Sequence, residues 1–274
     1  MAFWIDTHCH LDAPEFWPPA LTRYALAAIK NVVDCVVPAT HTANFDAVRN
    51  LAHAQGHSYA LGIHPLFVAD AHDDDLAVLD AALCRWQSDQ RLVAVGEIGL
   101  DFYVPALSSG ILRKRQEHFY HEQLNLARRY HLPVILHARR SVDQVLLGLR
   151  SSGLSGIAHA FNGSMQQATT FLDLGFKLGF GGAFTYDRAL HLRQLATTLP
   201  LDAIVLETDA PNMPPRWLHS TAQRAAGTSL RINSPAQLPR IGMELSALRG
   251  MSADPLAQAT TRNAMQALPK LQIS

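Results

Sequence analysis

The feature that most restricts how this chain can fold is a regular alternation of short apolar or β-branched runs with longer segments of helical periodicity. The short runs predict eight strands, at Ala2–Thr7, Val32–Val37, Tyr59–Ile63, Leu92–Gly96, Pro133–Leu136, Gly156–Ala158, Phe176–Phe180 and Ala203–Leu206. The intervening segments predict helices at Leu21–Lys30, Phe45–Gln55, Leu76–Ser88, Ile111–Tyr130, Val142–Arg150, Met165–Leu174 and Ala189–Thr198. Because parallel strands joined by helices form right-handed crossovers, this order predicts an α/β fold, a TIM or (β/α)₈ barrel.

Two additional C-terminal helices are expected after the last predicted strand, and Ser234-Pro235 and Asp254-Pro255 mark where they begin. Each pair places an N-cap side chain before a proline at the first helical position, and these helices would close the barrel. Asn212–Asn233 lacks periodicity and predicts a long loop, which is either a lid over the active face or a disordered insertion. The chain contains no internal repeat or linker, so residues 1–274 are expected to form one domain.

The charge balance and the cysteines restrict partners and location. Lys plus Arg and Asp plus Glu each number 23, so no bulk field attracts nucleic acid or an anionic membrane, and a polyanionic substrate must be held locally. The three cysteines are widely spaced and odd in number, as in a reducing compartment, and Cys35 and Cys84 are expected to be buried thiols. No signal-peptide pattern or membrane-spanning apolar run is present. We therefore expect a cytoplasmic monomer that needs no membrane and no obligate protein partner.

Six potential metal ligands follow predicted strands, and the C-terminal ends of its strands are where a parallel barrel keeps its chemistry. They are His8, His10, Glu97, His137, His159 and Asp209. His8 and His10 are two residues apart, so on an extended strand end their side chains point to the same face and can chelate one ion. Glu97 follows an apolar strand directly, where a charge is costly unless it is paired or bound to metal. The set predicts a hydrolase built around one or two divalent ions.

Six motifs are spread over nearly the whole chain: Asp6-Thr7-His8-Cys9-His10-Leu11-Asp12, Gly62-Ile63-His64-Pro65, Gly96-Glu97-Ile98-Gly99-Leu100-Asp101, Leu136-His137-Ala138-Arg139, His159-Ala160-Phe161-Asn162-Gly163-Ser164 and Glu207-Thr208-Asp209-Ala210-Pro211. As a set and in this order, they resemble the TatD family of metal-dependent hydrolases. The resemblance implies a TIM barrel of the amidohydrolase type, two divalent metal ions per chain and deoxyribonuclease activity.

The resemblance also implies how the ligands are shared between the ions. The first ion would be held by His8, His10, Glu97 and Asp209, and the second by Glu97, His137 and His159. Imidazole and carboxylate ligands accept Zn, Mn, Mg or Ni, so the residue types do not distinguish these metals.

The chain departs from the family pattern at positions expected on substrate-facing loops. Leu66 stands where many members have a second histidine, and Arg231-Ile232-Asn233-Ser234-Pro235 replaces an Arg-Gly-x-x-Asn-Glu-Pro motif. Tyr103–Gly110 is an unusual connector ahead of the next predicted helix. These departures leave the identity of the substrate open, but they do not affect the ligands.

Four residues are candidates for the chemistry itself. We expect Asp209 to orient and deprotonate a water that the two ions activate, and Glu97 to bridge the ions. His64 could bind a phosphoryl oxygen or protonate a leaving group. Alternatively, it is a packed histidine with a satisfied hydrogen bond and no role in the chemistry. Arg139, two residues after His137, either binds a substrate phosphate with its planar fork or forms an ion pair with a nearby carboxylate.

Other basic residues have more ordinary interpretations. Arg216, Arg224 and Arg231 on the long loop could extend a phosphate track, but the sequence has no basic stripe interleaved with aromatics. Single strands or DNA ends are therefore favoured over duplex as substrates. His118 and His121 lie beside acidic residues on a predicted helix, where a solvated surface is expected rather than a metal site.

Three functions are compatible with these residues. The leading hypothesis is a divalent-metal-dependent deoxyribonuclease that hydrolyses phosphodiesters, exonucleolytically on single-stranded DNA or DNA ends. The second keeps the same metal site but hydrolyses an ester or amide, as an aminoacyl-ester deacylase would, and needs no phosphate-binding arginine. The third is a metal-bound binding module without turnover, against which the complete ligand set argues.

Overall fold

The computed structural model describes residues 3–16, 31–218 and 232–271. It contains eight strands, β1 (Trp4–Asp6), β2 (Val32–Pro38), β3 (Ser58–Leu61), β4 (Leu92–Asp101), β5 (Val134–Arg139), β6 (Gly156–Ala158), β7 (Phe176–Phe180) and β8 (Ile204–Leu206). They form one sheet whose strand order is the order of the chain. The pairings of β1 with β2 and of β3 through β7 are parallel, as the alternation of strands and helices predicts.

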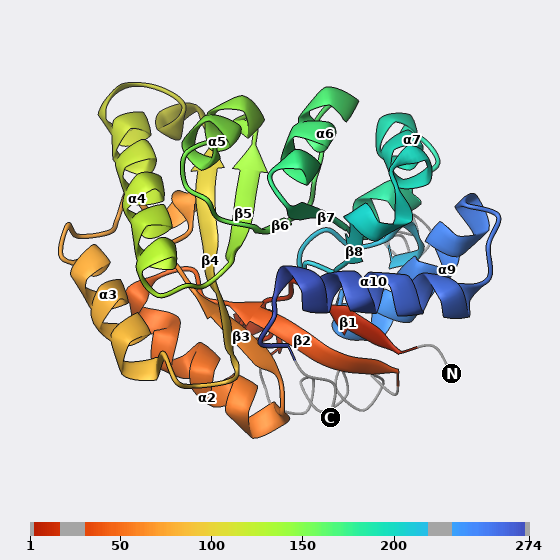
Figure 1. Cartoon of the computed structure of the whole chain (residues 1–274), viewed down its shortest axis with the longest axis horizontal. Coiled ribbons are helices and arrows are strands. Elements are labelled where there is room, and N and C mark those ends of the chain that lie inside the picture. The colour runs from red at the N-terminus through yellow and green to blue at the C-terminus, as the bar shows by residue number, and fades with distance from the viewer. Residues whose placement is uncertain (1–2, 17–30, 219–231, 272–274) are drawn as a thin grey trace, which may run out of the picture. The chain divides into compact units, whose positions relative to one another are not determined.

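The helices of the described residues are labelled in Figure 1. They are α2 (Phe45–Gln55), α3 (Asp75–Trp86), α4 (Gly110–Arg129), α5 (Val142–Leu149), α6 (Met165–Asp173), α7 (Leu190–Thr198), α9 (Leu238–Leu248) and α10 (Ala253–Ala267). Each agrees with a predicted helix to within a few residues, and the predicted helix Leu21–Lys30 lies outside the described residues. None of the described helices is long and apolar enough to cross a membrane.

The two C-terminal helices begin differently from the prediction. Ser234-Pro235 starts a short 3₁₀ turn, Pro235–Gln237, and α9 follows it with Pro239 in its first turn. α10 already begins at Ala253, so Asp254 and Pro255 lie inside its first turn. A proline is tolerated there because the first N–H groups of a helix have no acceptor within the helix.

The chain forms two compact units. The first comprises residues 1–37, 179–264 and 273–274, and the second comprises residues 38–178 and 265–272. The expectation of one domain over residues 1–274 stays a prediction, because compact packing does not show whether either unit folds alone.

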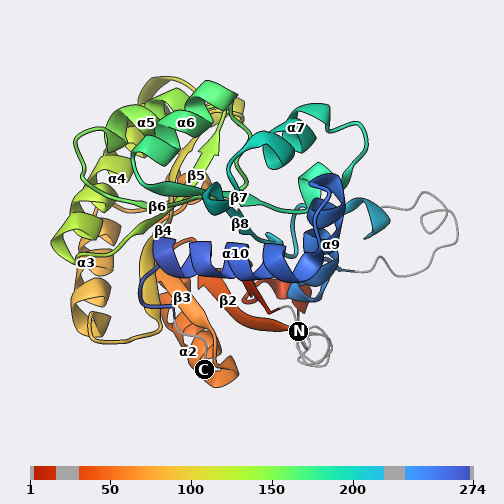
Figure 2. The same cartoon turned by 45° about the vertical axis from the view of Figure 1, so that its right-hand side comes forward.

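In the first unit, α9 and α10 cover β1 and β8. Gly242 of α9 lies so close to the indole of Trp4 in β1 that a Cβ there would clash with the ring. The Nδ2 group of Asn263 on α10 donates to the carbonyls of Leu201 and Ile204, both at 2.8 Å. Figure 2 shows α10 following α9, and these contacts hold the pair against the strands that precede His8 and Asp209.

In the second unit, two buried glutamines of α4 hold the ends of β3 and β4. Gln123 accepts from the backbone N–H of Ile63 at 2.7 Å and donates to its carbonyl at 3.1 Å. Gln116 makes the same two bonds with Asp101, at 2.9 and 3.3 Å. Both figures show α3 beside α4 on the outside of β4. The long helix therefore sets where the chain leaves these strands, just before His64 and just after Asp101.

Two strands are longer than the sequence predicts. β4 continues through the glycine-rich segment to Asp101, and β5 continues to Arg139, with Gly99 paired to His137 and Asp101 to Arg139. An irregularity between Val95 and Ile98 accommodates Gly96 within the strand. Glu97 and His137 consequently lie inside strands, so the prediction that each follows its strand was wrong.

Smaller expectations were also tested. Cys35 is buried as predicted, but Cys84 is exposed, so its predicted burial was wrong. Most of the predicted loop Asn212–Asn233 lies outside the described residues. Its two ends are joined, because Asn233 Nδ2 donates to the carbonyls of Thr208 and Asn212.

Candidate metal centre

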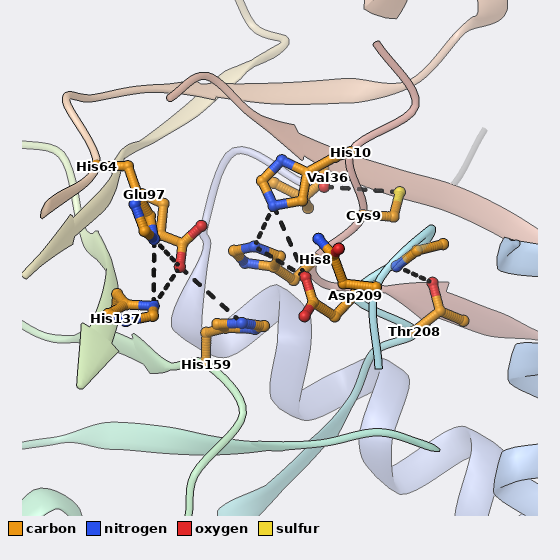
Figure 3. A network of polar contacts seen from close by, with 12 residues as sticks. His8, Cys9, His10, Val36, His64, Glu97, His137, His159, Thr208 and Asp209 are labelled. Carbon is orange, nitrogen blue, oxygen red and sulfur yellow. Dashed lines mark hydrogen bonds and ion pairs between the residues drawn. The ribbon is translucent and has the colours of Figure 1, made fainter. Parts of the chain in front are cut away.

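The first unit brings three predicted ligands together at the ends of β1 and β8 (Figure 3). The Nε2 atoms of His8 and His10 are 3.3 Å apart. Oδ1 of Asp209 lies 3.9 Å from Nε2 of His8 and 3.7 Å from Nε2 of His10. Three atoms with lone pairs therefore converge on one point, and the His-x-His spacing directs both rings there as predicted for a strand end.

Asp6 holds this group in place. One of its carboxylate oxygens accepts from the backbone N–H groups of His8 and Thr208 at 3.3 and 3.0 Å, and the other accepts from the Thr208 hydroxyl at 2.5 Å. Burial, together with the nearby Cys35, raises the pKa of Asp6 well above its usual range, although the bonds from Thr208 act in the opposite direction. The backbone N–H of Asp209 also donates to the carbonyl of His8 at 2.9 Å. Sequence reasoning gave Asp6 no role.

The second unit brings together Glu97 and three histidines (Figure 3). Oε1 of Glu97 lies 3.0 Å from Nδ1 of His137, 3.4 Å from Nε2 of His64 and 3.9 Å from Nε2 of His159. Glu97 is 2% exposed. A carboxylate at that depth is costly without partners, and here three imidazoles from separate segments supply them.

His137 lies between two carboxylates. Its Nδ1 faces Glu97, and its Nε2 is 3.0 Å from Oδ2 of Asp101. Burial lowers the pKa of His137, but the bonds to Asp101 and Glu97 outweigh burial and raise it above its ordinary value. For Asp101 the two effects have the opposite signs. Burial raises its pKa, but the hydrogen bonds from His137 and from two backbone N–H groups outweigh burial, so the pKa of Asp101 lies below its ordinary value.

Asp101 is a candidate site residue that the sequence did not predict. A carboxylate that accepts from Nε2–H of His137 fixes the tautomer in which Nδ1 keeps its lone pair toward Glu97. Oδ1 of Asp101 is occupied separately, because it accepts from the backbone N–H groups of Tyr103 and Val104. The signal was present in the sequence as a carboxylate after Gly99-Leu100, but only the pairing of β4 with β5 places it on His137.

The tautomer of His64 follows from its own hydrogen bonds. Its Nδ1 accepts from the backbone N–H of Leu66 at 3.1 Å, so a neutral ring carries its proton on Nε2. That nitrogen lies 3.2 Å from Nδ1 of His137, as well as near Glu97. The Nε2 atom of His64 therefore faces Glu97 and His137, and a role for His64 in the chemistry stays a prediction.

Arg139 follows the ligand group on β5 and is exposed. Its guanidinium carbon lies 3.6 Å from the centre of the Tyr103 ring. In the part of the chain that the structure describes, Arg139 forms no ion pair, so the alternative of a nearby carboxylate partner is not found there. By contrast, Arg216 pairs with Asp187 and Glu244, which indicates a structural role.

The remaining candidates are two arginines of the long loop and two histidines of α4. Arg224 and Arg231 lie outside the described residues. His118 and His121 are exposed on α4, and the ligand groups found among residues 3–16, 31–218 and 232–271 do not include them. A further cluster of Asp6, Cys9 and Cys35 is buried. Asp6 there already accepts three hydrogen bonds, which suits a structural role.

The donor atoms of the first group are spaced as the ligands of one divalent ion are. Ligands about 2.0–2.2 Å from a zinc-like ion at a tetrahedral angle lie about 3.3–3.6 Å from one another. The separations of 3.3, 3.7 and 3.9 Å in the first group are close to that range. Imidazole and carboxylate are also the ligand types that such ions prefer in hydrolases.

Comparison with known proteins agrees with this geometry. The family model for TatD related DNase matches residues 5–269. The chain belongs to the TatD family of metal-dependent hydrolases. It is 41% identical, over 94% of its length and 95% of the relative's, to the uncharacterized metal-dependent hydrolase YjjV of Escherichia coli. It is 29% identical to the human deoxyribonuclease TATDN3, over 98% of this chain and 95% of that one.

The crystal structure of YjjV, a TatD homologue from Escherichia coli, shares the fold. The TM-score is 0.84 at 40% identity, with 97% of this chain and 98% of that chain covered. The TIM barrel prediction is confirmed by this similarity together with the strand order. Membership of the TatD family does not by itself assign the ions, so the sharing of Glu97 between two of them stays a prediction.

Proposed function

We propose that this member of the TatD family is a deoxyribonuclease that hydrolyses phosphodiesters of single-stranded DNA or DNA ends with the help of two divalent ions. The observation that carries the proposal is the exposed guanidinium of Arg139, which lies two residues from His137 and has no ion pair within the described residues. A planar guanidinium in that setting matches the paired oxygens of a phosphoryl group. A neutral carboxyl ester would leave it without a role.

The ions would be held by His8, His10 and Asp209 in the first unit and by Glu97, His137 and His159 in the second. When bound, such ions act as Lewis acids and lower the pKa of water toward about 7. The ligand types leave Zn, Mn, Mg and Ni as candidates.

The side chains have separate tasks in this proposal. The carboxylate of Asp209 accepts the proton of the attacking water. The bond from Leu66 leaves the proton of a neutral His64 ring on Nε2, and His64 donates this proton to a phosphoryl or leaving oxygen. Arg139 binds phosphate oxygens of the DNA and thereby orients the substrate. Operation as a cytoplasmic monomer, without a membrane or an obligate partner, belongs to the same proposal.

A second function, hydrolysis of a carboxyl ester such as an aminoacyl ester, is favoured by one observation. Leu66 and Phe67, directly after His64, are 40% and 39% exposed. An apolar acyl group would bury these side chains. In that case Arg139 would contribute little to turnover.

The test is cleavage of an end-labelled single-stranded oligonucleotide by protein reloaded with Mg, Mn or Zn. We expect metal-dependent shortening that Glu97→Ala combined with Asp209→Asn abolishes and that Arg139→Gln weakens mainly through KM. Arg150→Gln, an exposed arginine after α5, is the matched control. Hydrolysis of a carboxyl ester without DNA cleavage would support the second function, and binding without turnover of either would overturn both.

A further inference from the structure

Tyr103, Arg139 and Arg140 form a compact group on the second unit. The guanidinium carbon of Arg139 is 3.6 Å from the centre of the Tyr103 ring, and that of Arg140 is 4.7 Å from the same centre. All three side chains reach the surface, with Tyr103 47% exposed. Two positive charges beside one exposed ring repel each other, and a bound anion would offset that repulsion.

The backbone makes this convergence occur. Successive side chains of a strand point to opposite faces, so Arg139 and Arg140 would normally diverge. Arg140, however, has a φ of 56°, a left-handed conformation that a non-glycine residue seldom adopts. This turn ends β5 and brings the guanidinium of Arg140 to the Tyr103 ring, on which the guanidinium of Arg139 already stacks. Conformations of this kind persist where the surroundings enforce them, often at binding sites.

Other stacked arginines of the second unit lack this excess of charge. Arg113 stacks on Phe102 and pairs with Glu117 at 2.9 Å. Arg49 and Arg85 share the Trp86 ring, but Arg49 pairs with Asp89 at 3.3 Å. Within the described residues, neither Arg139 nor Arg140 forms an ion pair. Within the described residues, two arginines without an ion pair therefore stack on Tyr103, whereas only one of the two arginines on Trp86 lacks an ion pair.

The ring that gathers the two arginines is itself fixed to the ligand group. Oδ1 of Asp101 accepts from the backbone N–H of Tyr103 at 2.8 Å, while its Oδ2 lies 3.0 Å from Nε2 of His137. The N–H of Phe102 donates to the carbonyl of Arg139 at 2.8 Å. One carboxylate thus positions both a candidate metal ligand and the aromatic platform, which keeps the two guanidiniums at a set position relative to His137.

We propose that Tyr103, Arg139 and Arg140 bind a terminal phosphomonoester of the substrate. A terminal phosphate carries close to two negative charges near neutral pH, whereas an internal phosphodiester carries one, so two guanidiniums complement the terminus. This subsite rests on the proposed function and narrows it, because it makes a phosphorylated DNA end the preferred substrate. Tyr103 is a positioning residue, and the two arginines contact the phosphate.

The test measures binding separately from cleavage. Short single-stranded oligonucleotides with a 5′-phosphate, a 3′-phosphate or two hydroxyl ends are titrated by fluorescence anisotropy against the Glu97→Ala protein in a chelator. One phosphorylated oligonucleotide is expected to bind about ten- to a hundredfold more tightly than the hydroxyl form, since bonds to a charged group contribute about that factor. The 5′ and 3′ arms identify the end that is recognised.

Variants then locate the subsite. Arg140→Gln and Tyr103→Ala should each abolish most of the preference for the phosphate, whereas Tyr103→Phe should keep it because the ring remains. Arg85→Gln is the matched control, since Arg85 also stacks on a ring that two arginines share and forms no ion pair within the described residues. If Tyr103→Ala does not fold, the comparison of Arg140→Gln with Tyr103→Phe and Arg85→Gln still decides the point.

The outcomes separate this inference from the proposed function. Equal binding of phosphate and hydroxyl ends, or an unchanged preference in Arg140→Gln, would overturn the subsite even if the protein cleaves DNA. A preference that depends on Arg140, in a protein that cleaves no DNA, would retain the subsite and overturn the deoxyribonuclease proposal.

Discussion

The two ligand groups contain the same kinds of side chain, but they are held in different ways. In the first unit, His8 and His10 come from one motif, and Asp6 positions them by accepting hydrogen bonds from the backbone of His8 and Thr208. In the second unit, the ligands come from separate strands, and the Asp101 carboxylate acts directly on the ring of His137. A local motif can be held through its backbone, whereas ligands that are distant in the sequence must be oriented through their side chains.

The largest effect is expected from Asp209→Asn, which removes the carboxylate of the first group but keeps both histidines. An amide cannot accept the proton of the attacking water, so single-turnover cleavage should fall by about 10²–10⁴-fold. Glu244→Gln, on the surface of the same unit, should leave the rate unchanged. Retention of the rate in Asp209→Asn would show that the base is another residue.

The second group should respond most to Asp101→Asn. The backbone N–H groups of Tyr103 and Val104 keep the amide oxygen at the Oδ1 position, so the amide nitrogen faces His137 and donates to Nε2. The imidazole must then carry its proton on Nδ1, where the ion would bind.

Such a change should weaken the binding of one ion by about 10–100-fold, as measured by metal titration of the chelator-stripped protein. Asp73→Asn removes an exposed carboxylate that pairs with Arg115 and is the control. Equal loss of both ions would contradict the separation of the two groups.

Asp6→Asn tests how the ligands of the first group are held. Its partners are mainly backbone groups, so the expected result is a loss of about 1–3 kcal/mol in the free energy of unfolding rather than a specific loss of one ion. Urea denaturation of the metal-free protein measures this directly. A variant that keeps its stability but loses one ion would show that Asp6 acts as Asp101 does.

The smallest effect is expected from Arg216→Gln. This arginine pairs with Asp187 and Glu244 on the surface of the first unit, at 3.2 and 3.1 Å. Exposed ion pairs contribute about 0–1 kcal/mol, so the midpoint of urea denaturation should shift little and cleavage should not change. A marked loss of DNA binding would instead return Arg216 to the phosphate track that the sequence suggested.

Strong local periodicity made most of the fold predictable. The bounds of α2, β6 and β7 are those that the sequence predicts, because each has clear apolar spacing and glycine or turn residues at its ends. Glycine misled the prediction for β4, where Gly96 and Gly99 resemble a turn but lie inside the strand. The pairing with β5 decided that segment, and local propensity did not.

The amino-acid sequence by itself determined the eight strands, the family and the ligand types, because spacing and residue chemistry are local properties of the chain. Only the tertiary structure decided that Asp101 orients His137, that Gln116 and Gln123 hold the strand ends, and that two arginines share Tyr103. These contacts depend on the register of β4 with β5 and on the packing of α4. Register and packing arise from interactions between segments that are distant in the sequence, so no local pattern records them.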